Sequence, residues 1–171
     1  MLIRQKAGNI ASVLIGERNI DWLEIEWYET GKRILRKRTQ GGKDIDLQFL
    51  NYSPQFMQGD ILYADEQELL VVDILPCEAI VIRPASLLAV AALCYEIGNK
   101  HLPLFLENEE LLVPYDAPLF NQLTAGAVAG GYIVSQEQRK LLYPLKTSVT
   151  AHMHADSAGS LFSRILQLTN R

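Results

Sequence analysis

The spacing of apolar residues changes once along the chain, and this change limits the folds that are open to it. Before residue 75 apolar and polar residues alternate, as in the segment 44–49 (DIDLQF). This period of two is that of a half-buried β-strand. Beyond Pro84 the apolar residues follow the spacing of an α-helix. Because the two parts have different periods, we expect two domains of different architecture with a boundary near residue 75.

Residues 1–75 are predicted to form a small all-β domain. The segment Ile20–Trp27 alternates as a strand does and ends at the turn residues 30–32 (TGK). Gly41-Gly42 marks a hairpin turn. Further strands are expected on both sides of that turn and later in the domain, at 34–35, 45–49, 61–63 and 69–75. Short strands at regular spacing are typical of a small sandwich or barrel.

Residues 76–147 are predicted to form a ferredoxin-like domain. Ser86 is a suitable N-cap for a helix over Leu87–Ile97, and Gly98-Asn99 ends that helix. In this helix the apolar residues at i, i+3, i+4 and i+7 spacing are Leu87, Val90, Ala91, Cys94 and Ile97. The other expected elements are a strand before Pro84, a hairpin around 108–109, a helix over Ala117–Ala125 and a strand over Tyr132–Ser135. The order β-α-β-β-α-β predicts an antiparallel sheet with two helices on one face. The fold class is therefore α+β.

Residues 148–171 are expected to form a flexible C-terminal tail. This tail starts with polar residues and contains His152 and His154. It ends with apolar residues between Leu161 and Leu168, which suffice for one short amphipathic helix.

Charge and cysteine content exclude several kinds of partner and site. The formal net charge of −4 and the pI near 5.4 argue against general binding to nucleic acids or anionic membranes. Cys77 and Cys94 lack the C-x-x-C spacing of zinc and redox sites. The longest apolar run, Leu87–Cys94, is far shorter than the roughly 20 residues that span a bilayer. We therefore expect a cytoplasmic protein that binds neither nucleic acid nor membrane.

The sequence contains no familiar motif of an enzyme. It lacks four common catalytic or nucleotide-binding patterns, namely G-x-S-x-G, H-E-x-x-H, G-x-x-x-x-G-K-[ST] and G-x-G-x-x-G. Acidic pairs such as Glu109-Glu110 are common in surface turns and need a positioned partner to act as acid and base. The chain is therefore predicted not to be an enzyme, and a metal-dependent hydrolase would require turnover that depends on His101.

The candidate metal ligands are the three histidines, His101, His152 and His154. His101 follows the predicted helix end, where a side chain projects from a rigid corner, although an isolated histidine there is more often a simple surface residue. His152 and His154 are two positions apart, so in an extended segment both imidazoles point to the same side. Imidazole nitrogens suit nickel, copper and zinc, whereas short His-x-His tracts also occur without function.

A basic run lies in the N-terminal part and comprises Lys32, Arg33, Arg36, Lys37 and Arg38. Such a run can bind RNA phosphates or an acidic protein surface. It is more often the solvated side of an edge strand, where charge discourages aggregation. An RNA- or ribosome-associated module, built from a β-barrel and a ferredoxin-like domain, is therefore the alternative function.

Several segments together carry a family resemblance. In the C-terminal part these are 94–101 (CYEIGNKH), Pro103 and 111–120 (LLVPYDAPLF). In the N-terminal part they are the pattern from Trp27 to Thr39 and the segment 58–62 (QGDIL). Over nearly its whole length the chain resembles the UreE family, nickel metallochaperones of urease maturation. A helix that ends in Gly-Asn-Arg/Lys-His is specific to that family.

The resemblance implies a homodimer that binds nickel between its subunits. It also implies an N-terminal domain similar to the peptide-binding domain of a heat-shock co-chaperone. The family's nickel-binding histidine corresponds to His101, which the two-fold axis of a dimer presents twice. Either His152 or His154 is then expected to add a ligand, with Asp156 or water as further candidates. Many relatives end in a histidine-rich stretch that this sequence lacks, so storage of many ions is not expected.

The function implied by the resemblance is delivery of Ni(II) to the urease apoprotein complex through the GTPase partner UreG. Imidazole ligands alone do not select nickel over copper or zinc. Zn(II) and Cu(II) are therefore expected to bind in vitro.

Overall fold

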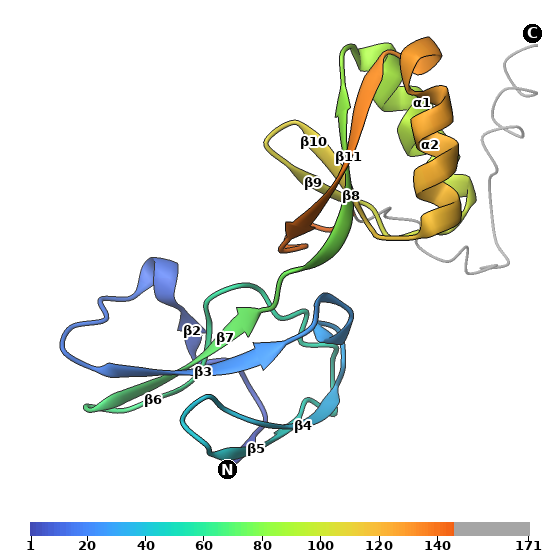
Figure 1. Cartoon of the computed structure of the whole chain (residues 1–171). Helices are drawn as coiled ribbons and strands as arrows, with labels where there is room; N and C mark the ends of the chain where they lie inside the picture. Colours follow the sequence, from blue (N-terminus) through green and yellow to red (C-terminus); the bar gives the residue numbers. More distant parts are fainter. Residues whose placement is uncertain (146–171) are drawn as a thin grey trace, which may run out of the picture.

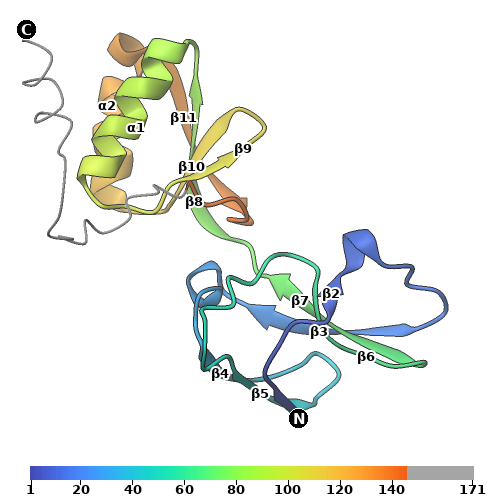
Figure 2. The same ribbon diagram turned by 180° about the vertical axis from the view of Figure 1, so that it is seen from behind.

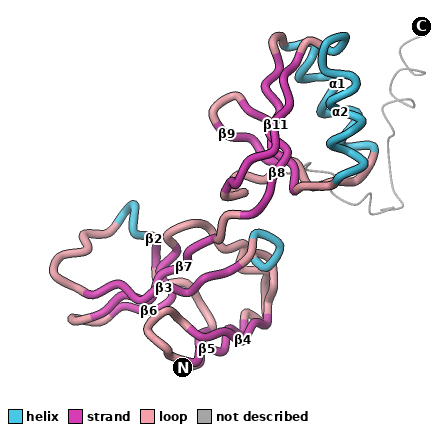
Figure 3. The backbone as a smooth tube through the Cα atoms, viewed as in Figure 1, coloured by secondary structure: helices cyan, strands magenta, loops and turns pink. Residues whose placement is uncertain are grey.

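The computed structural model describes residues 1–145, which form two bodies joined by one short connection (Figure 1). The N-terminal body contains β-strands and short 3-10 turns, and the C-terminal body contains a β-sheet with α-helices (Figure 3). Strand β7 of the first body ends at Ile74, and strand β8 of the second begins at Cys77. The predicted α+β class is confirmed.

The N-terminal body consists of two small sheets that pack against each other. One sheet has the strand order β1-β5-β4 and the other the order β2-β6-β7-β3. The strands are β1 (Leu2–Ile3), β2 (Gly8–Asn9), β3 (Asn19–Ile25), β4 (Ile34–Arg38), β5 (Asp44–Gln48), β6 (Asp60–Ala64) and β7 (Glu68–Ile74), and the 3-10 turns are η1 (Ile10–Ser12) and η2 (Trp27–Glu29). Strands β4 and β5 form the hairpin predicted around Gly41-Gly42. Gly42 has a φ of 87°, which glycine adopts without strain.

The apolar residues of the alternating strands lie between these two sheets. Leu35 and Leu47 of one sheet belong to the same buried cluster as Leu23 and Val72 of the other. Burial of each such side chain contributes roughly 1.5–3 kcal/mol, so the alternation itself directs which side of each strand faces inward.

The strand predicted over Ile20–Trp27 ends earlier than expected, at Ile25. The reason is a local cap, because the backbone N–H of Glu26 donates to Glu29 Oε2 at 3.0 Å and starts the turn η2. Glu29 is buried and also pairs with Lys37 Nζ at 2.5 Å. The turn takes Trp27 out of the sheet and sets its ring edge-on to Phe105 of the C-terminal body, with 5.7 Å between ring centroids.

The C-terminal body has the predicted order β-α-β-β-α-β, with β8 (Cys77–Pro84), α1 (Leu87–Asn99), β9 (Phe105–Glu107), β10 (Glu110–Pro114), α2 (Ala117–Gly130) and β11 (Tyr132–Arg139). Its sheet has the order β11-β8-β10-β9 with antiparallel neighbours, and both helices lie on one face (Figure 2). This is the ferredoxin-like arrangement. The core between helices and sheet includes Ile80, Ile82, Leu93, Ile97, Leu119 and Leu123.

Three elements of this body are longer than predicted. Helix α1 ends at Asn99, two residues after the predicted Ile97. Helix α2 continues past residue 125 to Gly130, and Gly131 ends it in the left-handed conformation with a φ of 66°. Strand β11 continues past Ser135 to Arg139, because each of its residues pairs with β8. No helix in the described part of the chain is long and apolar enough to cross a membrane.

Candidate metal-binding site

His101 lies at the corner where α1 ends. Ser86 caps the start of this helix, as predicted, and its Oγ accepts a hydrogen bond from the Ala89 N–H at 3.1 Å. At the other end the His101 N–H donates to the Gly98 carbonyl at 3.0 Å, and the Leu102 N–H donates to the Ile97 carbonyl at 3.5 Å. These two bonds form a Schellman motif, the usual way to satisfy the last carbonyls of a helix.

The backbone of His101 is in the left-handed region, with a φ of 56°. The Schellman motif requires this conformation at the residue after the cap, and glycine is the usual residue there. For a residue with a Cβ atom the conformation costs about 1–2 kcal/mol. Leu102 and Ile97 belong to the core cluster of the helices and hold the corner in place. The imidazole therefore occupies a position that folding alone would give to glycine, which points to a role other than folding.

A single chain does not build a metal site around His101 within residues 1–145. The side chain is exposed, and no three histidine, cysteine, aspartate or glutamate residues of that range lie close enough to hold a metal ion. The predicted tail ligands His152 and His154, like Asp156, lie outside the described residues. Their roles stay predictions.

Helix α1 carries a row of apolar residues on its outer side. Leu88, Ala92 and Tyr95 are exposed and fall at i, i+4 and i+7, so they share one side of the helix. Leu88 is 80% and Tyr95 74% exposed. The row, which we call the α1 stripe, leads toward the end of the helix at which His101 lies.

The buried side of α1 differs from the apolar spacing noted in the sequence. The residues that face the sheet are Ala89, Leu93 and Ile97, whereas Leu87 is 84% exposed. The helix is apolar on more than one side, so its spacing alone does not decide which side packs on the sheet. Within residues 1–145 the second apolar side is left uncovered.

Two family models match the chain over nearly its full length. The N-terminal domain of the UreE urease accessory protein matches residues 3–75, and its C-terminal domain matches residues 78–158. The chain belongs to the UreE family of urease accessory proteins. The division between the two UreE domain models coincides with the connection between β7 and β8.

Relatives named urease accessory protein UreE match with similar coverage. The protein of Flavobacterium johnsoniae is 40% identical over 168 residues, which are 98% of this chain and 99% of the relative. The protein of Acetivibrio thermocellus is 32% identical over 157 residues, 92% of this chain and 99% of the relative. The protein of Actinobacillus pleuropneumoniae is 36% identical over 138 residues, 81% of this chain and 72% of the relative. As the family name says, UreE is a urease accessory protein.

The cysteines of this UreE-family chain are poor metal ligands. Cys94 is half-buried on the sheet side of α1, and burial raises the pKa of its thiol above the usual 9.0. Burial, together with the nearby Glu26 carboxylate, also raises the pKa of Cys77. Because their pKa values are raised, both thiols are protonated near neutral pH. Metals bind the thiolate form, so these cysteines are poor ligands.

The basic run lies on and before β4 and is largely paired with carboxylates. Lys32 and Lys37 both contact buried Glu29. Arg36 pairs with Asp46 at 3.6 Å, and Arg38 pairs with Asp44 at 3.0 Å. Since these charges are compensated within the sandwich, the RNA-binding alternative is not favoured.

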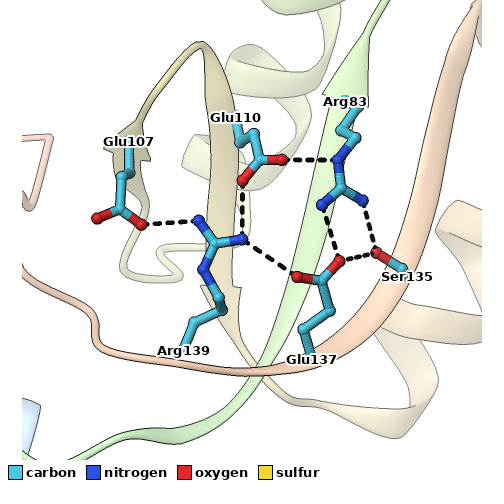
Figure 4. A network of polar contacts seen from close by, with 6 residues as sticks. All are labelled: Arg83, Glu107, Glu110, Ser135, Glu137 and Arg139. Atoms are coloured by element: carbon cyan, nitrogen blue, oxygen red, sulfur yellow. Dashed lines mark hydrogen bonds and ion pairs between the residues drawn. The ribbon is translucent and has the colours of Figure 1, made fainter.

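A second polar cluster, absent from the predictions, covers the face of the C-terminal sheet that points away from the helices (Figure 4). It comprises Arg83, Glu107, Glu110, Ser135, Glu137 and Arg139. Arg83 bridges Glu110 at 2.6 Å and Glu137 at 2.8 Å, and Arg139 bridges Glu107 at 2.7 Å and Glu110 at 2.8 Å. The Ser135 hydroxyl and the Arg83 guanidinium lower the pKa of Glu137 to about 2. All these carboxylates are held by arginines, so the cluster ties the four strands together and is not a metal site.

Proposed function

We propose that this UreE-family chain is a nickel metallochaperone that binds Ni(II) between the two His101 residues of a homodimer and delivers the ion for urease maturation. Membership in a family of urease accessory proteins supports a role in urease maturation. The backbone conformation of His101 at the end of α1 supports this residue as the nickel ligand. The observation that carries the proposal is an exposed histidine in a strained backbone conformation, at the end of a helix whose outer apolar side is uncovered within residues 1–145.

The α1 stripe provides the surface for a dimer. Leu88 and Tyr95 expose apolar area that water disfavours, and a two-fold axis would place this stripe against its own copy. Residues near such an axis meet their own equivalents, so the end of α1 would bring two imidazoles together. The dimer then supplies a second His101 imidazole, and with it a second nitrogen ligand for a shared ion.

The chemistry of such a site suits transfer of the ion and not its storage. Two neutral imidazoles leave most positions around Ni(II) open to water, to His152 or His154, and to the receiving protein. An open shell exchanges ligands more readily than a closed cage of four protein ligands. Zn(II) and Cu(II) are expected to compete in vitro, because imidazole binds them as well.

The partners that fit this role are the GTPase UreG and the urease apoprotein complex, in the cytoplasm. The name of the family, urease accessory protein, supports the link to urease maturation. The handover through UreG follows from the resemblance to metallochaperones of this family.

Nickel titration of the full chain tests the proposal. We compare the wild type, His101→Ala, a deletion after Thr150, and Lys100→Ala as a control next to the site, by calorimetry and by light scattering. His101→Ala should lose the tightest nickel site and remain a folded dimer, since its side chain is exposed. The deletion should weaken binding without abolishing it. Wild-type nickel affinity in His101→Ala would refute the proposal.

A further inference from the structure

An apolar groove of about 580 Å³ lies between the two bodies. One wall comes from η2 and the loop 55–57, with Trp27 and Met57. The other wall comes from Phe105 and from residues 141–144, which follow β11. Its volume lies within the roughly 300–1,000 Å³ of pockets that enclose a drug-sized ligand, so it has room for several apolar side chains.

The walls of this groove are held in place by contacts between the bodies. Lys140 Nζ pairs with Asp73 Oδ1 at 2.6 Å, and Leu142 packs against the core of the N-terminal body. The rings of Trp27 and Phe105, which both line the groove, pack edge to face. The groove is therefore preformed.

The rim of the groove exposes large apolar residues. Tyr28 is 58%, Met57 52% and Tyr143 54% exposed. Monomeric soluble proteins rarely leave a contiguous apolar surface of this kind uncovered unless something binds it.

The chain leaves its described part at this same groove. Pro144 lines the groove and forms a bridge with Phe105, and the Leu145 N–H donates to the Leu104 carbonyl at 2.7 Å. Residues 146–171 thus start at the rim. A segment tethered so closely has a high effective concentration there, in the millimolar range for short linkers.

We propose that the chain's own segment Leu161–Leu168 (LFSRILQL) occupies the groove. In this segment Leu161, Ile165 and Leu168 recur at i, i+4 and i+7, which would align them on one side of a helix. The stretch 146–160 that precedes it is mostly polar or small. The segment is thus the apolar part of the remaining chain, and it is connected directly to an apolar groove.

Docking of this segment would place the tail histidines near His101. Residues 146–160 would form a loop with His152 and His154 near its middle, and half of that loop spans about 25 Å when extended. Pro103 in the groove wall is two residues from His101, so their Cα atoms are at most about 7.6 Å apart. This consequence rests on the proposed nickel function, whereas the docking itself does not.

Hydrogen exchange of the full chain, without metal, tests the docking. We compare the wild type with a variant that combines Leu161→Ser, Phe162→Ser and Ile165→Ser, and with a control that combines Ser163→Ala and Gln167→Ala. The apolar variant should exchange several-fold faster in peptides that cover 27–31, 55–57 and 141–145. The control should match the wild type.

A second experiment changes a residue of the groove and measures exchange in the tail segment. Met57→Asp should speed exchange of the segment 161–168, whereas Leu14→Asp should not, because Leu14 is 91% exposed and does not line the groove. Unchanged exchange of the groove peptides in the tail variant would overturn the proposal. Protection that disappears on dilution would also overturn it, since the occupant would then be the tail of another molecule. Neither result depends on nickel binding, so failure of the docking is distinguishable from failure of the metal site.

Discussion

His101 combines an exposed side chain with a backbone conformation that disfavours it. The hydrogen bonds of its N–H and of the next N–H close the end of α1, and both require the left-handed turn at this position. Glycine, which has no Cβ atom, would allow those bonds without this conformational cost. Stability and the proposed metal binding therefore place opposite demands on this residue.

Substitution His101→Gly separates the two demands. We expect the free energy of unfolding to rise by about 1 kcal/mol or less, because relief of the left-handed strain is partly offset by the greater freedom of glycine in the unfolded chain. The tightest nickel site should be lost. Urea unfolding and nickel titration measure the two effects. His101→Asn, which tolerates the same turn, is the control that should change stability little. A loss of stability in His101→Gly would show that the imidazole itself supports the corner.

At the scale of elements, strand β11 shows how polar residues can lie within a sheet. Its odd-numbered side chains Ser135, Glu137 and Arg139 face away from the helices and join the ion network with Arg83 of β8 (Figure 4). Val134 faces the core between helices and sheet. On the face of the sheet away from the helices, the ion network satisfies these polar side chains. Strand β11 can therefore continue beyond the point where its sequence becomes polar.

The low pKa of Glu137 makes the network sensitive to acid. Its pKa in the folded chain is about 2, below the ordinary value of 4.5, so the carboxylate contributes stability above pH 4.5. This contribution is lost as the pH falls from about 4.5 toward 2. Glu137→Gln should therefore lower the melting temperature at pH 7, and the difference from wild type should shrink toward pH 2. Calorimetric melting between these pH values measures it, with the exposed Glu66→Gln as control. A difference independent of pH would contradict the assignment.

At the scale of the whole molecule, an isolated chain leaves two apolar surfaces uncovered within residues 1–145. One is the α1 stripe, and the other is the groove between the bodies. They lie on different parts of the molecule, since the stripe is on the outer side of the helical layer and the groove is lined by both bodies. The α1 stripe suits another copy of the chain, and the groove suits the chain's own C-terminal segment.

Assembly through the stripe is tested by Tyr95→Asp. A carboxylate in an apolar interface loses its hydration without gaining a partner, so we expect the dimer to dissociate. The nickel stoichiometry should change with it, since each monomer keeps one His101 but no longer shares an ion. Light scattering and nickel titration give the readout, and Tyr28→Asp, on the other body, should remain dimeric. A dimeric Tyr95→Asp with unaltered nickel binding would place the interface elsewhere.

Several features of the fold could be predicted from local signals alone. The change of period, the cap at Ser86 and the turn at 108–109 each depend on neighbouring residues, and the elements they predict are present. Asn108 and Glu109 both have positive φ, as a tight hairpin turn requires. The alternation of apolar and polar residues predicts a strand that continues to Trp27. The capping contact between Glu26 and Glu29 starts the turn η2 instead and ends β3 early.

By itself the sequence determined the α+β class, the order of the elements in the C-terminal body, the family and the choice of His101 as the candidate ligand, because periodicity, caps and motifs are properties of neighbouring residues. It did not predict the short strands β1 and β2. Only the tertiary structure decided which side of α1 faces the sheet, how the basic run of β4 is neutralised, and that the two bodies enclose a groove. These features depend on contacts between residues far apart in the chain, such as Lys140 with Asp73. The sequence pattern of one segment does not indicate which distant residue will contact it in the folded chain.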